Sequence, residues 1–334
     1  MERPRILWLA SGALSGLRAS DGTNALEFLM FAAPPVIETK LVGRLPESFH
    51  VTGRVCDRYG TRKLYIEGPA LARDGTLYFV DIPAGRIFAM SPKGEFSILV
   101  EYDGHPNGLK IHKDGRIFIA DYKNGIMFVD PAKRKVEPFL TRVANQPLHG
   151  PNDLAFASNG DIYFTDQGNS DIVRPTGRVV RVRPSGEWDI LLSDLPSPNG
   201  LVLSPDEQSL YVALTRSNNI WKAPLDVPPG LAACSAVGTT GVFVQMSGGT
   251  GPDGMAVDEA GNVVVAHTGL GCVWVFSPLG EPLYRVNTCA GLSISNVVYG
   301  GPERKTLYIT ESSTGSILSA QMPVAGQLLY AEMA

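Results

Sequence analysis

The chain has 334 residues, a formal net charge of −4 and a sequence pI near 5.8, and 44% of its residues are hydrophobic. The weak negative charge argues against nucleic acid or an anionic membrane surface as a partner. No uninterrupted apolar run of about 18 residues is present, so no membrane span is expected. The 36 Gly and 25 Pro residues are high for a helical protein and ordinary for a turn-rich β protein.

Residues 1–34 are expected to form an N-terminal extension ahead of one catalytic domain over residues 35–334. The basic start and broken apolar run of the extension leave a secretory signal open as an alternative. An upstream extension before a more natural beginning at Met30 is a third interpretation. We expect a cytoplasmic protein, because four scattered cysteines without metal-site spacing fit free thiols in a reducing compartment. These are Cys56, Cys234, Cys272 and Cys289.

From residue 67 onward a short unit recurs six times, at intervals of 40 to 54 residues. We number the first residue of each unit as position 0. In most units, apolar residues at positions 2 and 4 indicate a strand with one buried face, and a turn then leads to a second strand rich in aromatic and branched residues. The exceptions are Pro69 at position 2 of the first unit and Gly300 at position 4 of the sixth. In chain order the units read EGPALARDGTLYFVD, NGLKIHKDGRIFIAD, NDLAFASNGDIYFTD, NGLVLSPDEQSLYVAL, DGMAVDEAGNVVVAH and NVVYGGPERKTLYITES.

Further strand-like segments fill each unit, so the repeat is a meander of about four strands. A sheet this small cannot bury both faces alone, whereas copies stacked radially can. The period is too long for leucine-rich or hexapeptide solenoids, and the 3.6-residue periodicity of helical repeats is missing. We therefore predict an all-β fold, a six-bladed β-propeller with a central metal-binding channel. We expect a strand from residues 35–66 to pair with the C-terminal blade and close the ring.

Position 0 lies at the mouth of the first strand of every blade, and that strand usually lines the channel. Turn preference alone favours Asn and Asp, because they bond their own backbone and tolerate left-handed conformations. Six aligned residues that are all oxygen donors instead predict a site for a hard cation such as Ca²⁺, or the stricter Mg²⁺. The absence of Cys and His argues against a soft metal. The six are Glu67, Asn107, Asn152, Asn199, Asp253 and Asn296.

A six-bladed ring is wider than one ion, so we expect four direct ligands, Glu67, Asn152, Asn199 and Asp253. Asn107 and Asn296 are then expected to contact substrate or water. Other polar residues are predicted near the same end of the blades. Among them, Asp166 and His105 are candidates for substrate contact, and Asp153 and His267 are candidates for orienting the ligands from behind.

Other common chemistries have no signature in this sequence. It contains no GxSxG nucleophile elbow, no HExxH zinc motif, no P-loop and no GxGxxG that leads from a strand into a helix. The glycine-rich stretch at residues 247–254 precedes a strand, so no helix follows it to bind a phosphate.

At these residues the sequence resembles the SMP-30/gluconolactonase family, which includes regucalcin and bacterial lactonases. The stretches that carry the resemblance are IEGPALARDGTLYFVD, GPNDLAFASNGDIYFTDQGN, PSPNGLVLSPDEQSLYVAL, GPDGMAVDEAGNVVVAH and LYITES. They are specific as an ordered set, and the resemblance covers about residues 35–325. It implies a small-molecule lactone as substrate and one catalytic divalent metal, usually Ca²⁺, with Zn²⁺, Mn²⁺ or Mg²⁺ in some members.

Carried over by motif, the metal ligands are again Glu67, Asn152, Asn199 and Asp253, and Asn107 matches the substrate-binding Asn. The implied reaction is lactone hydrolysis, in which the metal polarises the carbonyl and Asp253 is the general base for water. Relatives often have Arg two residues before the substrate-binding Asn. This chain has His105 there, which leaves the preferred lactone open.

Three other functions remain as alternatives. One is a phosphotriesterase on the same metal ring, resembling squid-type diisopropyl fluorophosphatase, in which the aspartate is thought to attack phosphorus. Another is a non-enzymatic propeller that binds a partner on its rim. The last is a strictosidine-synthase-like propeller, although such proteins generally lack this ring. The oligomeric state is not predicted.

Overall fold

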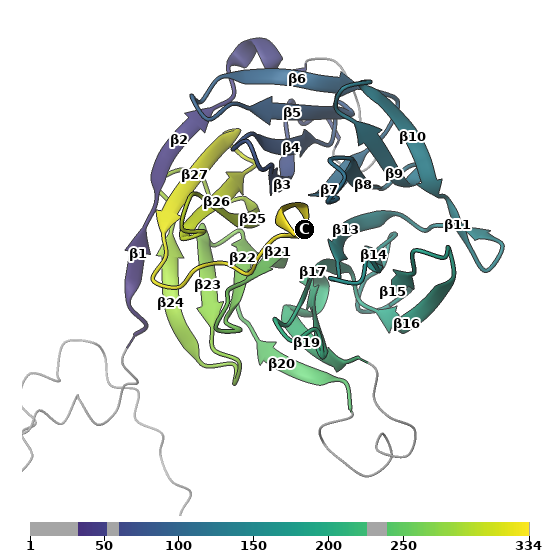
Figure 1. Ribbon diagram of the computed structural model, residues 1–334. Helices are drawn as coiled ribbons and strands as arrows, with labels where there is room; N and C mark the ends of the chain where they lie inside the picture. Colours follow the sequence, from purple (N-terminus) through teal and green to yellow (C-terminus); the bar gives the residue numbers. More distant parts are fainter. Residues whose placement is uncertain (1–32, 52–59, 226–238, 334) are drawn as a thin grey trace, which may run out of the picture. The chain divides into compact units, whose positions relative to one another are not determined.

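The computed structural model describes residues 33–51, 60–225 and 239–333, so the predicted extension 1–34 lies almost entirely outside the described residues. The propeller unit, Val36–Ala334, contains six sheets arranged around a central channel (Figure 1). The predicted all-β, six-bladed propeller is confirmed. Over the described ranges the only helices are short 3-10 turns, namely η1 (Glu47–Phe49), η2 (Thr215–Ser217) and η4 (Tyr330–Glu332).

The blades follow one another in chain order, and in each the first strand lies nearest the axis. Blade 1 is β3 (Ile66–Leu71), β4 (Leu77–Asp81), β5 (Arg86–Met90) and β6 (Phe96–Glu101). Blade 2 is β7 (Pro106–Ile111), β8 (Ile117–Asp121), β9 (Gly125–Asp130) and β10 (Lys135–Leu140). Blade 3 is β13 (Pro151–Phe156), β14 (Ile162–Asp166), β15 (Gly177–Val182) and β16 (Trp188–Leu195).

The second half of the ring repeats this arrangement. Blade 4 is β17 (Pro198–Leu203), β18 (Ser209–Leu214), β19 (Asn219–Pro224) and β20 (Gly241–Gln245). Blade 5 is β21 (Gly251–Val257), β22 (Val263–Thr268), β23 (Cys272–Phe276) and β24 (Pro282–Asn287). Blade 6 is β25 (Ile294–Gly300), β26 (Thr306–Glu311) and β27 (Ser316–Gln321). A two-stranded ribbon, β11 (Arg142–Val143) and β12 (Gln146–Pro147), lies between blades 2 and 3 in the chain.

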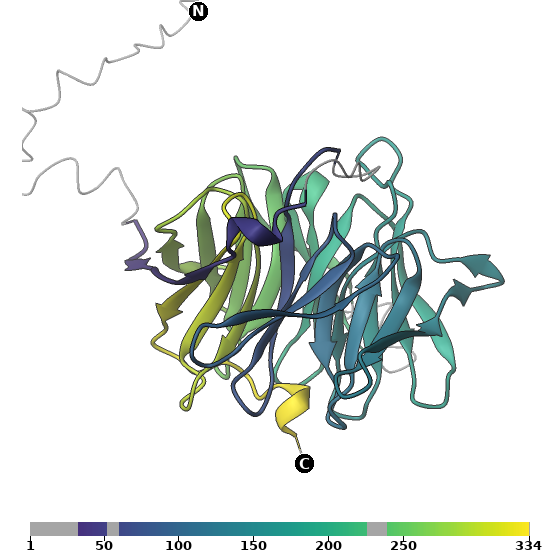
Figure 2. The ribbon, with the colours of Figure 1, turned by 90° about the horizontal axis from the view of Figure 1, so that it is seen from above.

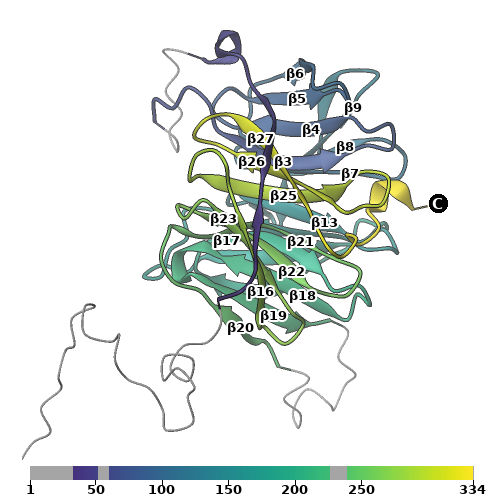
Figure 3. The same cartoon turned by 90° about the vertical axis from the view of Figure 1, so that its left-hand side faces the viewer.

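The ring is closed by the N-terminal part of the unit. Strand β2 (Lys40–Arg44) pairs antiparallel with β27 and supplies the fourth strand of blade 6, as predicted. Strand β1 (Val36–Glu38) pairs parallel with β24 and adds a fifth strand to blade 5. Figure 3 shows this segment running along the outer edge of both blades. Because the first strands of the unit complete the sheets of its last two blades, the two ends of the chain are held together and the ring is closed.

Apolar side chains between neighbouring sheets make the core. One cluster joins blades 5 and 6 through residues such as Val264 and Val297, and another joins blades 1 and 2 through residues such as Ile87 and Leu109. Each blade thus buries its faces against the next, as the repeat argument requires. No helix in the described ranges is long and apolar enough to cross a membrane.

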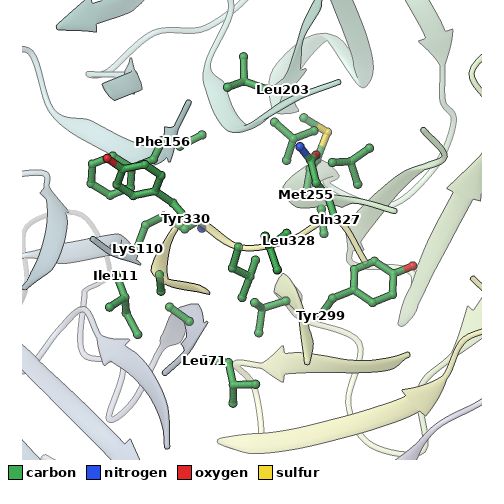
Figure 4. A pocket seen from close by; sticks show the side chains of 18 of the residues that line it. Leu71, Lys110, Ile111, Phe156, Leu203, Met255, Tyr299, Gln327, Leu328 and Tyr330 are labelled. Atoms are coloured by element: carbon green, nitrogen blue, oxygen red, sulfur yellow. The ribbon is translucent and has the colours of Figure 1, made fainter. Parts of the chain in front are cut away.

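The C-terminal segment after β27 crosses one end of the channel (Figures 2 and 4). The backbone N–H of Gln327 donates to the carbonyl of Val257 over 3.1 Å, and the Arg73 guanidinium donates to the carbonyl of Ala331 over 2.5 Å. The Tyr330 ring stacks on Phe156 with centroids 4.8 Å apart. The segment therefore spans blades 5, 1 and 3 and closes an apolar cavity of about 130 Å³.

Candidate metal centre

A β-bulge marks the start of every inner strand. The register shifts at the second to fourth residue of β3, β7, β13, β17, β21 and β25 alike. A bulge bends the strand and turns one side chain away from the regular alternation. Repeated around a ring, it turns one side chain of each blade towards the axis.

Five of the six predicted ring residues line one cavity of about 290 Å³ at this end of the channel. All five are buried. They are Glu67, Asn107, Asn152, Asn199 and Asp253. The sequence therefore located the residues that meet at the axis in blades 1 to 5.

The sixth blade is one residue out of the predicted alignment. Asn296 pairs with Thr310 across the sheet, as Gly108 at position 1 of blade 2 pairs with Ala120. Position 0 of blade 6 is therefore Ser295, whose hydroxyl is bonded to the carbonyl of Ile66 over 2.8 Å. The predicted register was wrong there, because this unit lacks the Pro and Gly that mark the turn in blades 2, 4 and 5.

The corrected register makes Asn296 the counterpart of Asp153, which also stands at position 1. Both backbone N–H groups donate to a Thr hydroxyl on the next strand, each over 3.1 Å. The two side chains meet, since Asn296 Nδ2 donates to Asp153 Oδ2 over 3.2 Å. The same amide nitrogen lies 3.3 Å from Glu67 Oε1, so Asn296 supports the ring from behind and is outside the cavity lining.

Position 1 is Gly in the other four blades, where the neighbouring blade comes too close to leave room for a side chain. A Cβ on Gly254 would lie 2.0 Å from Cγ of Asn296, and one on Gly108 would lie 2.3 Å from Oδ1 of Asp153. Asp153 and Asn296 thus fill space that the glycines leave. We call this pair the partition, because it lies between the ring and the apolar end of the same strands.

Two amide oxygens of the ring have no hydrogen-bond partner among the described residues. They are Oδ1 of Asn152 and Oδ1 of Asn199, and both atoms are buried. The nitrogen of each amide is held within its own blade, by Gln167 Oε1 at 3.1 Å and by Thr215 Oγ1 at 3.1 Å. An unsatisfied buried carbonyl costs about 1–3 kcal/mol, which a cation coordinating both oxygens would offset.

The orientation of Asn199 follows from its neighbour. The Thr215 hydroxyl donates its one proton to the carbonyl of Pro252 over 2.8 Å. It can then only accept from Asn199, so the NH₂ end of that amide faces Thr215 and the oxygen faces away.

The carboxylates of the ring make the site electrostatically suited to a positive ion. Burial raises the pKa of Glu67 well above its ordinary value, and the charges of Asp253 and Asp153 raise it further. The Gly68 N–H, which donates to Glu67 Oε2 over 2.6 Å, and the Lys110 ammonium act in the opposite direction. Buried like charges are costly without a counter-ion.

The donor set fits a hard divalent ion. No group of three or more His, Cys, Asp or Glu side chains within the described ranges is arranged to hold a metal. A cation bound in this cavity would therefore depend on amide oxygens as well as carboxylates, which is the preference of Ca²⁺.

Asp166 lies outside the cavity lining and is fully buried. Its Oδ1 accepts from the backbone N–H of Gly150 over 2.8 Å, and its Oδ2 accepts from Arg178 over 2.8 Å. Asp121 accepts from the N–H of His105 in the same way over 3.2 Å. These acidic residues at the ends of the second strands hold the loop that enters the blade.

Neither predicted histidine lines the cavity. His267 is buried with Nε2 3.0 Å from the carbonyl of Gly248, and burial lowers its pKa. It supports the loop whose Thr250 does line the cavity. His105 is half-buried, and its carbonyl accepts from the N–H of Tyr122 over 2.9 Å.

The sequence interpretation missed a second set of lining residues. Three of them, Gln167, Thr215 and Thr268, each follow the second-strand residue that pairs with the Pro before position 0 in their blade. The repeat contains this position, so its polar residues were a usable signal. The others lie in loops without a repeat and are Arg62, Tyr65, Ser197, Arg216 and Thr250.

Comparisons with known proteins agree with this architecture. The family model for the SMP-30/Gluconolactonase/LRE-like region matches residues 66–313. A gluconolactonase from Zymomonas mobilis is 33% identical over 274 residues, 74% of this chain and 76% of that protein.

Solved structures extend the likeness to the fold. A gluconolactonase from Xanthomonas campestris has a TM-score of 0.67 at 26% identity, covering 78% of this chain and 86% of that one. A calcium-binding regucalcin from Agrobacterium tumefaciens has a TM-score of 0.71 at 19% identity, covering 90% and 100%. The second of these likenesses concerns the fold alone.

Proposed function

The chain belongs to the SMP-30/gluconolactonase family, and we propose that it is a divalent-metal-dependent lactonase that hydrolyses a small lactone to a hydroxy acid. The gluconolactonase from Zymomonas mobilis supports the reaction class. The observation that supports the metal dependence is the pair of buried oxygens of Asn152 and Asn199, which have no partner among the described residues and line the same cavity as two buried carboxylates.

The residues that would hold the ion are Glu67, Asn152, Asn199 and Asp253. Two carboxylates match the charge of a divalent cation, and two neutral amides add donors without adding charge. Ca²⁺ is the proposed ion, with Zn²⁺, Mn²⁺ and Mg²⁺ as alternatives. When bound, the ion would supply Lewis acidity to the lactone carbonyl.

Asp253 is the proposed general base. Its side chain lines the cavity among the proposed ligands, while Glu67, the other carboxylate of the ring, accepts from Gly68 N–H at one oxygen and from Asn296 at the other. Asp253 takes a proton from water as the water oxygen bonds to the carbonyl carbon. The bond from that carbon to the ring oxygen then breaks, and the proton returns from Asp253 to the departing oxygen.

Asn107 is the proposed substrate-positioning residue. It lines the cavity together with the four proposed ligands and is 2% exposed. Asp166, His105 and Asn296 do not line the cavity, so the structure does not support their predicted contact with substrate.

Acid release from glucono-1,5-lactone, corrected for spontaneous opening, tests this proposal. Chelator-treated protein should be inactive and should regain activity with Ca²⁺. Asp253→Asn should be inactive in both states, whereas Asp103→Asn, a change at a side chain that is 91% exposed, should behave as wild type. Equal rates for holo, chelated and Asp253→Asn protein would contradict the proposal. Turnover of a phosphotriester alone would favour the phosphotriesterase alternative.

A further inference from the structure

Two arginine side chains line the cavity above the ring, Arg62 from the segment before β3 and Arg216 from η2. Neither guanidinium has a hydrogen bond or an ion pair with any residue in the described ranges. Each presents donors that are always charged and suited to bidentate binding of a planar or tetrahedral anion.

Arg62 is held near the cavity by an aromatic platform. Its guanidinium lies 5.3 Å from the centroid of the Tyr65 ring. The backbone N–H of Tyr65 donates to Asp81 Oδ1 over 3.0 Å, which fixes the platform at the entry of blade 1. Stacking on an aromatic face leaves the edge of the guanidinium free to donate hydrogen bonds.

Arg216 directly follows Thr215, the residue that holds the Asn199 side chain in the ring. Thr215 binds the Asn199 amide and the Pro252 carbonyl, so the start of η2 is fixed against blades 4 and 5. One acidic residue lies close by, since the Arg216 charge is among the causes that lower the pKa of Asp171. Asp171 is exposed and also accepts from the backbone N–H groups of Val173 and Arg174, so it offsets only part of the charge.

The charge balance of the cavity points to an anionic ligand. Its lining contains two carboxylates, Glu67 and Asp253, and two guanidiniums. A divalent cation on the ring would cancel the carboxylates and leave the guanidiniums offset only in part, by Asp171 near Arg216. This local excess of positive charge contrasts with the net charge of −4 of the whole chain.

From these observations we infer that the preferred substrate is a lactone bearing an anionic group, a carboxylate or a phosphate, which Arg62 and Arg216 bind while the carbonyl lies over the ring. The inference rests on the proposed lactonase function and adds the substrate class. The remaining lining residues suit a polyhydroxylated ring, because they are hydroxyls and amides such as Ser197, Thr250 and Gln167.

The test compares kcat/KM for three lactones with wild-type protein in saturating Ca²⁺. Glucono-1,5-lactone is the neutral probe, glucaro-1,4-lactone carries a carboxylate and 6-phosphoglucono-1,5-lactone carries a phosphate. At least one anionic lactone should exceed the neutral one by about tenfold or more. The two anionic probes decide between carboxylate and phosphate.

The variants Arg62→Gln and Arg216→Gln should each lower the ratio of anionic to neutral kcat/KM by about tenfold or more, mainly through KM. Lys133→Gln is the control, because this cationic side chain is 74% exposed and does not line the cavity. It should leave the ratio within about twofold, since a rim charge is screened by solvent.

Hydrolysis of the neutral lactone without any anionic preference, or an unchanged ratio in both variants, overturns the inference and leaves the lactonase proposal standing. Hydrolysis of none of the three lactones overturns both.

Discussion

The two ends of the channel are built from the same six strands and differ in almost every property. At position 0, five of the six residues are polar side chains that converge on one cavity. At position 4, in the corrected register, all six are large and apolar and line the cavity under the C-terminal segment (Figure 4). The position 4 residues are Leu71, Ile111, Phe156, Leu203, Val257 and Tyr299.

In each inner strand, we therefore assign binding and catalysis to the polar end and stability to the apolar end. Four residues of extended chain span about 13 Å, so a polar ring and an apolar ring can coexist in one blade. Asp153 of the partition between them is paired with Lys110, whose Nζ lies 3.4 Å from Asp153 Oδ1. Changes at the ring should therefore affect binding and turnover, and changes at the apolar end should affect unfolding.

Removal of the proposed base has the largest expected effect. Asp253→Asn should lower kcat by about 10²- to 10⁴-fold in saturating Ca²⁺, the range for loss of a general base. The free energy of unfolding without metal should not fall, because the change removes a charge that disfavours ionised Glu67. Steady-state kinetics and urea unfolding of the same preparation check both parts. A variant that unfolds more easily and retains turnover would contradict the claim that ring residues serve catalysis and not stability.

A change in the partition should act on metal affinity. Asn296→Ala removes the donor to Glu67 Oε1 and leaves Asp153 without its amide partner. Loss of a group that orients a ligand typically costs 10–100-fold in metal affinity. Calcium titration by calorimetry measures the effect, with the exposed Asn159→Ala as control. Unaltered affinity would mean that the partition does not support the ring.

The pH dependence of calcium binding tests the raised pKa of Glu67 in the ring. A raised pKa makes the native, metal-free protein hold a proton on Glu67 that the unfolded chain has lost. The stability this provides is present below the ordinary pKa of 4.5 and is lost as the pH rises through the native value. A cation competes with that proton, so it should stabilise more at pH 8 than at pH 5.

Thermal unfolding with and without Ca²⁺ at the two pH values measures this difference. At 100 times its dissociation constant, a ligand adds about 2.7 kcal/mol, or roughly 4 °C in Tm for a chain of this size. A calcium effect that is equal at both pH values would contradict the role assigned to Glu67.

The apolar end should respond in stability alone. Tyr330→Ala removes a buried ring stacked on Phe156 and should lower the free energy of unfolding by about 2–4 kcal/mol. Leu328→Ala in the same segment should cost less than about 1 kcal/mol, because that side chain is 44% exposed. Urea unfolding gives both values. In each variant kcat/KM for gluconolactone should stay within about twofold, and a larger loss would show that the two ends are coupled.

Repetition decided what the sequence could predict. Six copies of one pattern predicted the propeller and five of the ring residues. The closing strand was expected within residues 35–66, and the structure identifies it as β2. Asn296 was misplaced where its copy lacks the turn residues of the rest. Arg62, Arg216 and the C-terminal segment lie outside the repeat, so only the folded ring brings them to the channel.

The most direct test of the account is a calcium titration of chelator-treated protein by calorimetry. We predict one Ca²⁺ per chain, and loss of that binding in the double variant Asn152→Ala/Asn199→Ala with its fold intact by circular dichroism. The prediction follows from the two buried amide oxygens that lack a partner among the described residues. Binding that is absent in the wild type, or undiminished in the double variant, would contradict the claim that this ring is a metal centre.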